Sequence, residues 1–448
     1  MFLFGKAGRD VLRGGAGDDI LYGFGGDDSL LGGAGHDVLA GHEGNDTLSG
    51  GTGDDYLLGG LGTDVIDGGA GVDWAAYEDA TAAVKVSLAL TGWQATGGAG
   101  SDKLTGIENL YGSAFNDTLI GNAGVNYLSG GAGDDRLEGG AGDDHLEGGR
   151  GADTIIGGDG WDVVSYDDAA GPVFVNLASG YANTYDLDIL TSGAGIDFDT
   201  RPNIGHDSLH GIEDVYGSQF GDVIFDNDAD NYLIGQGGND FLFTNAGNDT
   251  LDGGSGNDVF YTNEGTGFTV LMGGDGTDTI HFAHVYDTKG IRIDLRDTGP
   301  QNIDGTRTFI LSSIENVNGT AFDDTLIASA GKNTFWGYDG RDTFVFPPGD
   351  APTDERQVDT IISFETGVDC ISFGATGNYT EIEATTYTAA FSAARDLIAS
   401  GSHNIVAVEV NNIHNVYVFS DGNETNTVTS VLKLANSDLS GIAGTDFI

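Results

Sequence analysis

Cysteine, proline and basic residues are scarce in this sequence. Its 448 residues include one cysteine and 6 prolines, and 17 Lys+Arg stand against 70 Asp+Glu. With Cys370 alone, no intrachain disulfide can form. Binding to phosphates needs clustered Lys and Arg, so a formal net charge of −53 excludes nucleic acid as a partner.

Long apolar runs are missing as well. None approaches the roughly eighteen consecutive apolar residues of a transmembrane helix, so we expect no membrane span. The opening segment, MFLFGKAGRD, lacks the basic region and the long apolar core of a signal peptide. An extracellular protein with this sequence would therefore need another export route.

Glycine and acidic residues are abundant instead. The chain has 77 glycines, and glycine loses more backbone freedom on folding than any other residue. Disorder is one interpretation of such a composition. Against it, 39% of the residues are hydrophobic, and the 23 Phe and 16 Tyr are spaced regularly. We therefore expect a chain that folds when a cation neutralises its acids.

A nonapeptide, GGxGxDxLx, repeats along the chain. An apolar residue, such as Leu21 or Leu30, usually follows two positions after its aspartate. The sixth position, Asp or Asn, recurs with the period of the unit in four arrays, which run from Asp10 to Asp73, Asp117 to Asp162, Asp222 to Asp258 and Asp324 to Asp342.

Each position of the nonapeptide has a physical reason. Glycines allow positive φ, so the backbone can turn tightly and aim its carbonyl groups inward. The aspartate supplies carboxylate oxygen, which Ca²⁺ prefers, whereas Mg²⁺ needs near-octahedral geometry and gives up water reluctantly. The xLx segment is a short strand whose leucine lies inside. Two nonapeptides thus make one coil, and we expect each calcium ion between successive coils along one side.

Calcium is the expected cofactor, at multiple sites. The alternative is a β-solenoid with acidic loops and no ion, but stacked like charges would repel one another strongly. The expected ligands are sixth-position aspartates: Asp10, Asp19, Asp28, Asp37, Asp46, Asp55, Asp64, Asp135, Asp144, Asp153, Asp240, Asp249, Asp258 and Asp342.

Three longer segments interrupt the repeats in a related way. They begin with DWAAYEDATAAVKVSL, DVVSYDDAAGPVFVNL and DTIHFAHVYDTKGIRIDL, and an IEN or IED segment follows each. We expect wider β-helical coils there. The middle one carries an insertion, which could form a binding loop or a neutral surface loop. The predicted organisation is repeat blocks at 1–73, 117–162, 222–278 and 324–346, wider units at 74–116, 163–221 and 279–323, and a C-terminal region at 347–448.

The C-terminal region predicts a cap. Glycine thins out, and residues 388–401, TAAFSAARDLIASG, have apolar residues at helical spacing. The alternating segments NIVAVEVNN and NVYVFSDGN predict a hairpin. An open solenoid end must be covered. The predicted fold is therefore all-β: a parallel β-roll or β-helix solenoid with several repeat blocks and a small β-rich cap containing one helix.

The nonapeptides resemble the RTX family of calcium-binding β-rolls. This resemblance implies RTX blocks that fold on extracellular Ca²⁺, and it implies no particular activity. The segments DTFVF, DTIISFETGVDCISF, NVYVFSDGN and GTDFI resemble the C-terminal region of serralysin-like secreted proteases. That likeness implies an extracellular or cell-surface protein, exported by the type I secretion machinery through a C-terminus that ends in Asp446, Phe447 and Ile448.

Two catalytic motifs are absent from the sequence. There is no HExxH, which excludes the metalloprotease of that resemblance, and no GxSxG, which excludes an RTX lipase with that motif. The leading hypothesis is a module that binds extracellular or cell-surface glycan, with acidic polysaccharide as the expected partner. The alternatives are a polysaccharide lyase or glycanase acting on acidic polysaccharide, and a surface-array or adhesin subunit.

The lyase hypothesis depends on the middle insertion. A β-eliminating lyase neutralises a uronate carboxylate and needs a base and an acid. Residues of these types lie in or beside the insertion, and each also fits an ordinary exposed loop. The candidate catalytic residues are Tyr181, Tyr185, Arg201 and His206.

Overall fold

A computed structural model describes the chain in two compact units, Met1–Phe225 and Asp226–Ile448. Within the described residues, no helix is long and apolar enough to cross a membrane. The described residues are 1–184, 204–262, 267–282, 289–347, 355–373, 379–384, 386–400, 403, 405–410, 415–421, 428–435, 442 and 446–447.

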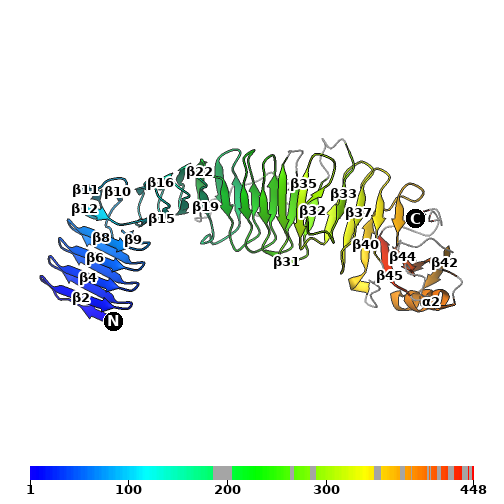
Figure 1. Ribbon diagram of the computed structural model, residues 1–448, viewed down its shortest axis with the longest axis horizontal. Coiled ribbons are helices and arrows are strands. Elements are labelled where there is room, and N and C mark those ends of the chain that lie inside the picture. The colour runs from blue at the N-terminus through cyan, green and yellow to red at the C-terminus, as the bar shows by residue number, and fades with distance from the viewer. Residues whose placement is uncertain are drawn as a thin grey trace. The chain divides into compact units, whose positions relative to one another are not determined.

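The nonapeptide builds the coil of the first unit. Consecutive repeats place their strands in opposite sheets, and strands 18 residues apart pair in parallel. Leu21 pairs with Leu39 in one sheet and Leu30 with Leu48 in the other, and at most 1% of each side chain is exposed. The leucines thus form a continuous core between the sheets. The prediction of a parallel β-roll with inward leucines is confirmed (Figure 1).

The first unit has two walls. One wall is a parallel sheet, called sheet I below: β1 (Phe2–Phe4), β3 (Ile20–Gly25), β5 (Val38–Glu43), β7 (Tyr56–Leu61), β9 (Trp74–Ala76), β13 (Asn109–Tyr111), β15 (Tyr127–Ala132), β17 (His145–Arg150), β19 (Val163–Ser165) and β23 (Asp214–Tyr216). The other wall begins with β2 (Val11–Ala16), β4 (Ser29–Ala34), β6 (Thr47–Thr52), β8 (Val65–Ala70), β12 (Gly100–Thr105) and β11 (Gln94–Gly97). It continues with β10 (Lys85–Ser87), β14 (Thr118–Ile120), β16 (Arg136–Ala141), β18 (Thr154–Asp159), β20 (Val173–Asn176), β21 (Tyr181–Thr184), β22 (His206–His210) and β24 (Val223–Phe225).

Wider coils interrupt this roll where the sequence predicts them. Ile66 of β8 pairs in parallel with Leu104 of β12, and Ile155 of β18 pairs with Leu209 of β22. The extra chain forms antiparallel ribbons, β11 against β12 and β21 against β20 and β22. Part of the middle insertion is therefore strand β21, and residues 185–203 lie outside the described residues. The eight segment boundaries stay a prediction.

The second unit repeats the same plan. Its parallel strands are β25 (Tyr232–Ile234), β27 (Thr250–Asp252), β30 (Phe268–Met272) and β35 (Thr308–Ser312), with β34 (Gln301–Asn302) antiparallel to β35. A second parallel row is β26 (Phe241–Thr244), β29 (Val259–Thr262), β32 (Thr279–His281), β36 (Asn316–Asn318), β38 (Thr334–Trp336) and β40 (Asp359–Ile362). Smaller sheets are β28 (Ser255–Gly256) with β31 (Asp275–Gly276), and β33 (Arg292–Asp294), β37 (Thr325–Ile327), β39 (Thr343–Val345) and β41 (Cys370–Ser372).

A small cap ends the second unit. Helix α2 (Tyr387–Ala399) begins after Thr386, whose hydroxyl accepts the N–H of Ala389, and its apolar face packs on strands β43 and β44 (Figure 1). The predicted hairpin is β43 (Ile405–Val410) with β44 (Asn415–Ser420), so the predicted helix and hairpin are both confirmed. The other cap elements are the 3-10 turn η1 (Glu355–Gln357), β42 (Tyr379–Ala384) and β45 (Ser430–Ala435).

Candidate calcium sites

The sixth-position aspartates form ladders along the coils. The backbone N–H of Asp19 donates to Oδ1 of Asp37 at 2.8 Å, and Asp37 donates likewise to Asp55 at 2.8 Å. A second ladder in the same block joins Asp28 to Asp46 at 2.7 Å. The aspartates of consecutive repeats therefore stand in two columns, and the expected single row of ions along one side is wrong. The reason is that each coil contains two turns, and each turn carries an aspartate.

The second carboxylate oxygen of these aspartates is buried without a hydrogen-bond partner. A buried polar atom left unpaired costs on the order of 1–3 kcal/mol, and an isolated buried charge costs more. A long row of such oxygens therefore demands a ligand. Unpartnered Oδ2 atoms belong to Asp19, Asp28, Asp37, Asp46, Asp55, Asp64, Asp73, Asp135, Asp144, Asp153, Asp162, Asp258, Asp278 and Asp342.

A backbone carbonyl lies beside most of these orphaned oxygens, with Asp64, Asp153 and Asp342 as the exceptions. A Cβ atom at Gly14 would clash with two oxygens, Oδ2 of Asp19 and the carbonyl oxygen of Gly32 in the next coil. The same pair of oxygens surrounds Gly50, with Asp55 Oδ2 and the Gly68 carbonyl. Only glycine leaves this space open. Carboxylate and carbonyl oxygens are the donors that Ca²⁺ takes, so the residues present fit this ion.

The last coil of a repeat block keeps this arrangement. The space beside Gly68 is bounded by Asp73 Oδ2 and the carbonyl oxygen of Gly106, which has φ of 57°. The Asp73 N–H donates to Oε2 of Glu108 at 2.9 Å, so the glutamate of the IEN segment replaces the next aspartate of the ladder. Equivalent geometry surrounds Asp162, with Gly211, and Asp278, with Ser313.

These three block-end aspartates were not among the expected ligands, although their geometry matches that of the others. Asp73, Asp162 and Asp278 stand in register with the arrays, and the register alone could have found them. In the structure, the carbonyl that completes each site comes from the far side of a wider coil.

Other register positions are satisfied without an ion. The hydroxyl of Ser113 donates to Asp117 at 2.8 Å, and Thr320 donates to Asp324 at 2.9 Å. At the Asn positions the amide donates instead, as Nδ2 of Asn126 does to the Glu108 carbonyl at 2.7 Å. None of these residues was among the expected ligands.

Two expected ligands differ from the rest. Oδ2 of Asp10 accepts the N–H of Lys6 at 2.6 Å, and Oδ2 of Asp249 accepts the hydroxyl of Thr244 at 2.6 Å. Asp240 has the common arrangement, since the space beside Gly235 is bounded by its Oδ2 and the Gly253 carbonyl.

Burial raises the pKa of the ladder carboxylates. It raises the pKa of Asp55 to about 6, of Asp64 and Asp153 to about 7, and of Asp342 to about 8. Backbone N–H donors oppose this shift, and neighbouring carboxylates add to it, as Asp46 does for Asp64. The charged form of these carboxylates is therefore disfavoured by burial, and either a proton or a cation would neutralise it.

The structure describes two of the four candidate catalytic residues. Tyr181 in β21 and His206 in β22 lie on adjacent antiparallel strands, with ring centroids 5.7 Å apart. His206 is exposed and Tyr181 is partly buried against Phe174. Tyr185 and Arg201 lie outside the described residues. A catalytic role for the four residues stays a prediction.

Comparison with known proteins identifies the repeats. The family model for the RTX calcium-binding nonapeptide repeat matches more than half of the chain, and no curated protein matches. Among solved structures, an extracellular lipase, LipA from Serratia marcescens, is 18% identical over 74% of this chain and 40% of the lipase, with a TM-score of 0.13. The chain therefore spans less than half of the lipase's length. The residues matched by the family model are 4–39, 41–75, 105–137, 138–169, 209–242, 216–251, 234–269 and 314–346.

Proposed function

Because this chain belongs to the RTX calcium-binding nonapeptide repeat family, we propose that it is exported unfolded, folds on extracellular Ca²⁺, and then binds glycan. Calcium binding by a β-roll is the family's property. Export, the individual ligands and the glycan partner are the parts that we add. The observation that carries the proposal is the set of buried aspartate oxygens that have a carbonyl opposite and no hydrogen-bond donor.

In this proposal, the difference in calcium concentration between the inside and the outside of the cell determines where the chain folds. Without the ion, the coils bring buried carboxylates into two columns, and desolvation and like charges oppose folding. An ion held between Oδ2 and the carbonyl of the next coil neutralises the acid and holds the glycine turns together. Low intracellular calcium would thus leave the repeats unfolded, and extracellular calcium would fold them.

The C-terminal tail fits export before folding. Phe447 pairs with Ile371 of β41 and stacks on Phe373 at 6.5 Å, and 8% of its side chain is exposed. Asp446 is buried beside it and accepts the N–H of Gly367 at 3.1 Å. These contacts need the last coils to be formed. A secretion machinery that recognises this tail would therefore have to bind it before the chain folds.

The outer face of sheet I carries the observation that supports glycan binding. Four half-buried rings line this face from β7 to β17: Tyr56, Trp74, Tyr127 and His145. Their ring centroids are 6.5, 5.0 and 4.2 Å apart in that order. Asn109 of β13 holds the register position between Trp74 and Tyr127, whose rings meet across it. Tyr and Trp offer an apolar ring together with a hydrogen-bonding group. Such a row on a rigid sheet is suited to an extended partner with both hydroxyl and C–H surfaces, as a polysaccharide has.

A lyase or glycanase is the second candidate. The observation in its favour is the adjacency of Tyr181 and His206, because a hydroxyl and an imidazole on neighbouring strands can serve as acid and base. A lyase leaves an unsaturated product that absorbs ultraviolet light, whereas a hydrolase leaves reducing ends only. A binding module leaves neither product.

One experiment separates these functions. The full chain is refolded in 5 mM CaCl2 or in EDTA, with folding followed by circular dichroism. Each form is then mixed with immobilised neutral, amino-bearing and uronate polysaccharides. We expect strand content and glycan retention in calcium only, without new ultraviolet absorbance or reducing ends. Full strand content in EDTA would refute calcium-driven folding, and product formation would make the chain an enzyme.

A further inference from the structure

Two equivalent turns stand over the outer face of sheet I. The segments Tyr77–Ala80 (YEDA) and Tyr166–Ala169 (YDDA) follow β9 and β19, and each is closed by an N–H···O bond of 3.0 Å from its alanine to its tyrosine. The tyrosine of each turn is buried in the coil, and the acidic residues after it are exposed. The first two wider units therefore project acidic groups onto the same sheet face, separated by strands β13, β15 and β17.

A pocket of about 320 Å³ lies between these turns. Register explains the hollow, because Ser129 of β15 stands between Tyr111 of β13 and Glu147 of β17 in one row of the sheet. The small serine forms the floor, with 2% of it exposed, and the larger tyrosine and glutamate form the sides. Glu78 from the first turn and Asp168 from the second complete the wall. We call this the inter-turn pocket.

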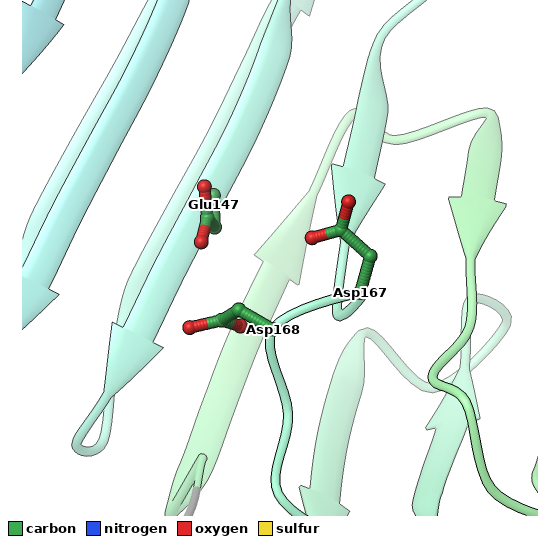
Figure 2. A group of neighbouring side chains, drawn as sticks. All are labelled: Glu147, Asp167 and Asp168. Carbon is green, nitrogen blue, oxygen red and sulfur yellow. The ribbon is translucent and has the colours of Figure 1, made fainter.

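The pocket is rich in fixed hydrogen-bonding groups. Oε2 of Glu147 accepts the hydroxyl of Tyr127 at 2.8 Å. Figure 2 shows Glu147 facing Asp167 and Asp168 of the second turn, with one carboxylate oxygen of each within 4.8 Å of the others. Burial, followed by the charges of Glu147 and Glu78, raises the pKa of Tyr111, so these acids surround the phenol. Arg150 is the one basic residue among the described residues that line the pocket.

These features select a class of ligand. We propose that the inter-turn pocket binds one sugar residue that carries no negative charge, with Glu147 and Asp168 accepting its hydroxyl or amino hydrogens and Tyr111 packing on its ring. The volume is at the small end of the roughly 300–1,000 Å³ of ligand pockets, which suits a single ring. Glu78, Glu147 and Asp168 outnumber Arg150, so a uronate carboxylate would be repelled.

This inference rests on the proposed glycan-binding function and narrows it. The sequence led us to expect acidic polysaccharide, whereas the charge of this pocket favours neutral and amino-bearing glycans. The aromatic row of Tyr127 and His145 lies on the same strands as the pocket, so neighbouring sugar units would continue along it.

The test uses the calcium-saturated full chain and three probes: hexamers of glucose, of glucosamine and of galacturonate, titrated by calorimetry in 5 mM CaCl2. Ser129→Leu fills the floor of the pocket. The row itself accommodates a leucine, because Leu58 occupies the same row, three strands from Ser129 along the sheet. Glu147→Gln keeps the shape and removes the charge. The matched control is Ser49→Leu in β6, whose partner across the pair is Leu31.

We expect the glucose and glucosamine hexamers to bind, glucosamine more tightly at low salt, and the galacturonate hexamer not to bind. Ser129→Leu and Glu147→Gln should each weaken binding at least tenfold, and Ser49→Leu should not change it. Glycan binding that both pocket variants retain would overturn the pocket and leave the function standing. Binding of the galacturonate hexamer alone would also overturn the pocket assignment. So would a Glu147→Gln variant that binds one calcium ion fewer but keeps its affinity for the sugars. Failure of all glycans in all assays would overturn the function as well.

Discussion

Replacing one ladder aspartate by asparagine should have opposite effects with and without calcium. Oδ1 of Asp55 accepts the N–H of Asp37 at 2.8 Å, and Oδ2 is buried without a partner beside the Gly68 carbonyl. In Asp55→Asn the amide oxygen can keep the bond to Asp37, and the NH2 group takes the place of the orphaned oxygen. An NH2 group cannot ligate a cation, but it can donate to a carbonyl.

The size of the loss in calcium follows from linkage. A site with a dissociation constant on the order of 10⁻⁴–10⁻³ M adds about 1.4–2.7 kcal/mol to the free energy of unfolding at 10 mM free calcium. Asp55→Asn should lose this amount. Without calcium the sign reverses, because burial raises the pKa of Asp55 to about 6 and its charged form opposes folding at pH 7.5. Removing that charge should stabilise the metal-free roll.

Urea unfolding at pH 7.5 measures both effects. One series contains 10 mM CaCl2, and the other contains EDTA with an osmolyte that strengthens burial enough to fold the metal-free chain. The matched control is Asp117→Asn, because both oxygens of Asp117 already accept hydrogen bonds, from Ser113 and from the backbone N–H of Val84. This control should lose about 1 kcal/mol in both series. Equal destabilisation by Asp55→Asn in the two series would refute the assignment of the orphaned oxygens to calcium.

Three further predictions concern pH, stacking and the tail. Burial raises the pKa of Asp64 and Asp153 from 3.8 to about 7 in the folded state. The metal-free roll therefore takes up protons on folding, and its free energy of unfolding should rise as the pH falls from 8 to 5. Protons also compete with calcium for the carboxylates, so the calcium concentration at the folding midpoint should rise over the same pH range. Gly53→Ala places a Cβ atom against the carbonyl of the preceding coil and should abolish calcium-induced folding of its block, as measured by circular dichroism. In the control, Gly17→Ala, the new Cβ meets no atom within 4 Å, so the variant should lose only the roughly 1–2 kcal/mol that a positive φ costs. Carboxypeptidase should remove Phe447 from the chain in EDTA but not from the calcium-saturated chain, because Phe447 is buried only when the cap is folded. Mass spectrometry would show the difference. Removal at equal rates in the two conditions would contradict the docking of the tail.

The coil itself could be predicted because its information is local. A glycine pair, an aspartate and an inward leucine recur with a fixed period, and that period determines the parallel pairing of Leu21 with Leu39. The same local logic explains the confirmed helix, since Thr386 caps it and its buried face has helical spacing. The expectation of ions along one side did not anticipate the two columns of aspartates, because these depend on how two turns are placed in one coil.

The wider coils were expected, but the pairing across them and the pocket could not be predicted, because both depend on residues far apart in the sequence. Asp64 donates its N–H to Asp102, 38 residues away, and Asp153 donates to Asp207, 54 residues away. Neither distance can be read from the nonapeptide. Ser129 likewise looks like an ordinary repeat residue until the register sets it between Tyr111 and Glu147. The sequence signal for ligand binding pointed to the middle insertion, whereas the pocket is lined by residues of the first two wider units and of the repeat block between them.

The hydroxyl-satisfied aspartates show how the wider units serve the calcium blocks. Asp117, Asp222 and Asp324 each open an array, and the hydroxyl of Ser113, Ser218 or Thr320 donates to each at 2.8–2.9 Å. A buried carboxylate with its own donors needs no cation. Each of these arrays therefore starts with an aspartate that its own donors already satisfy. We accordingly expect calcium-induced order to spread into the repeat blocks from the wider units, which would give the alternation of the two along the chain a physical reason.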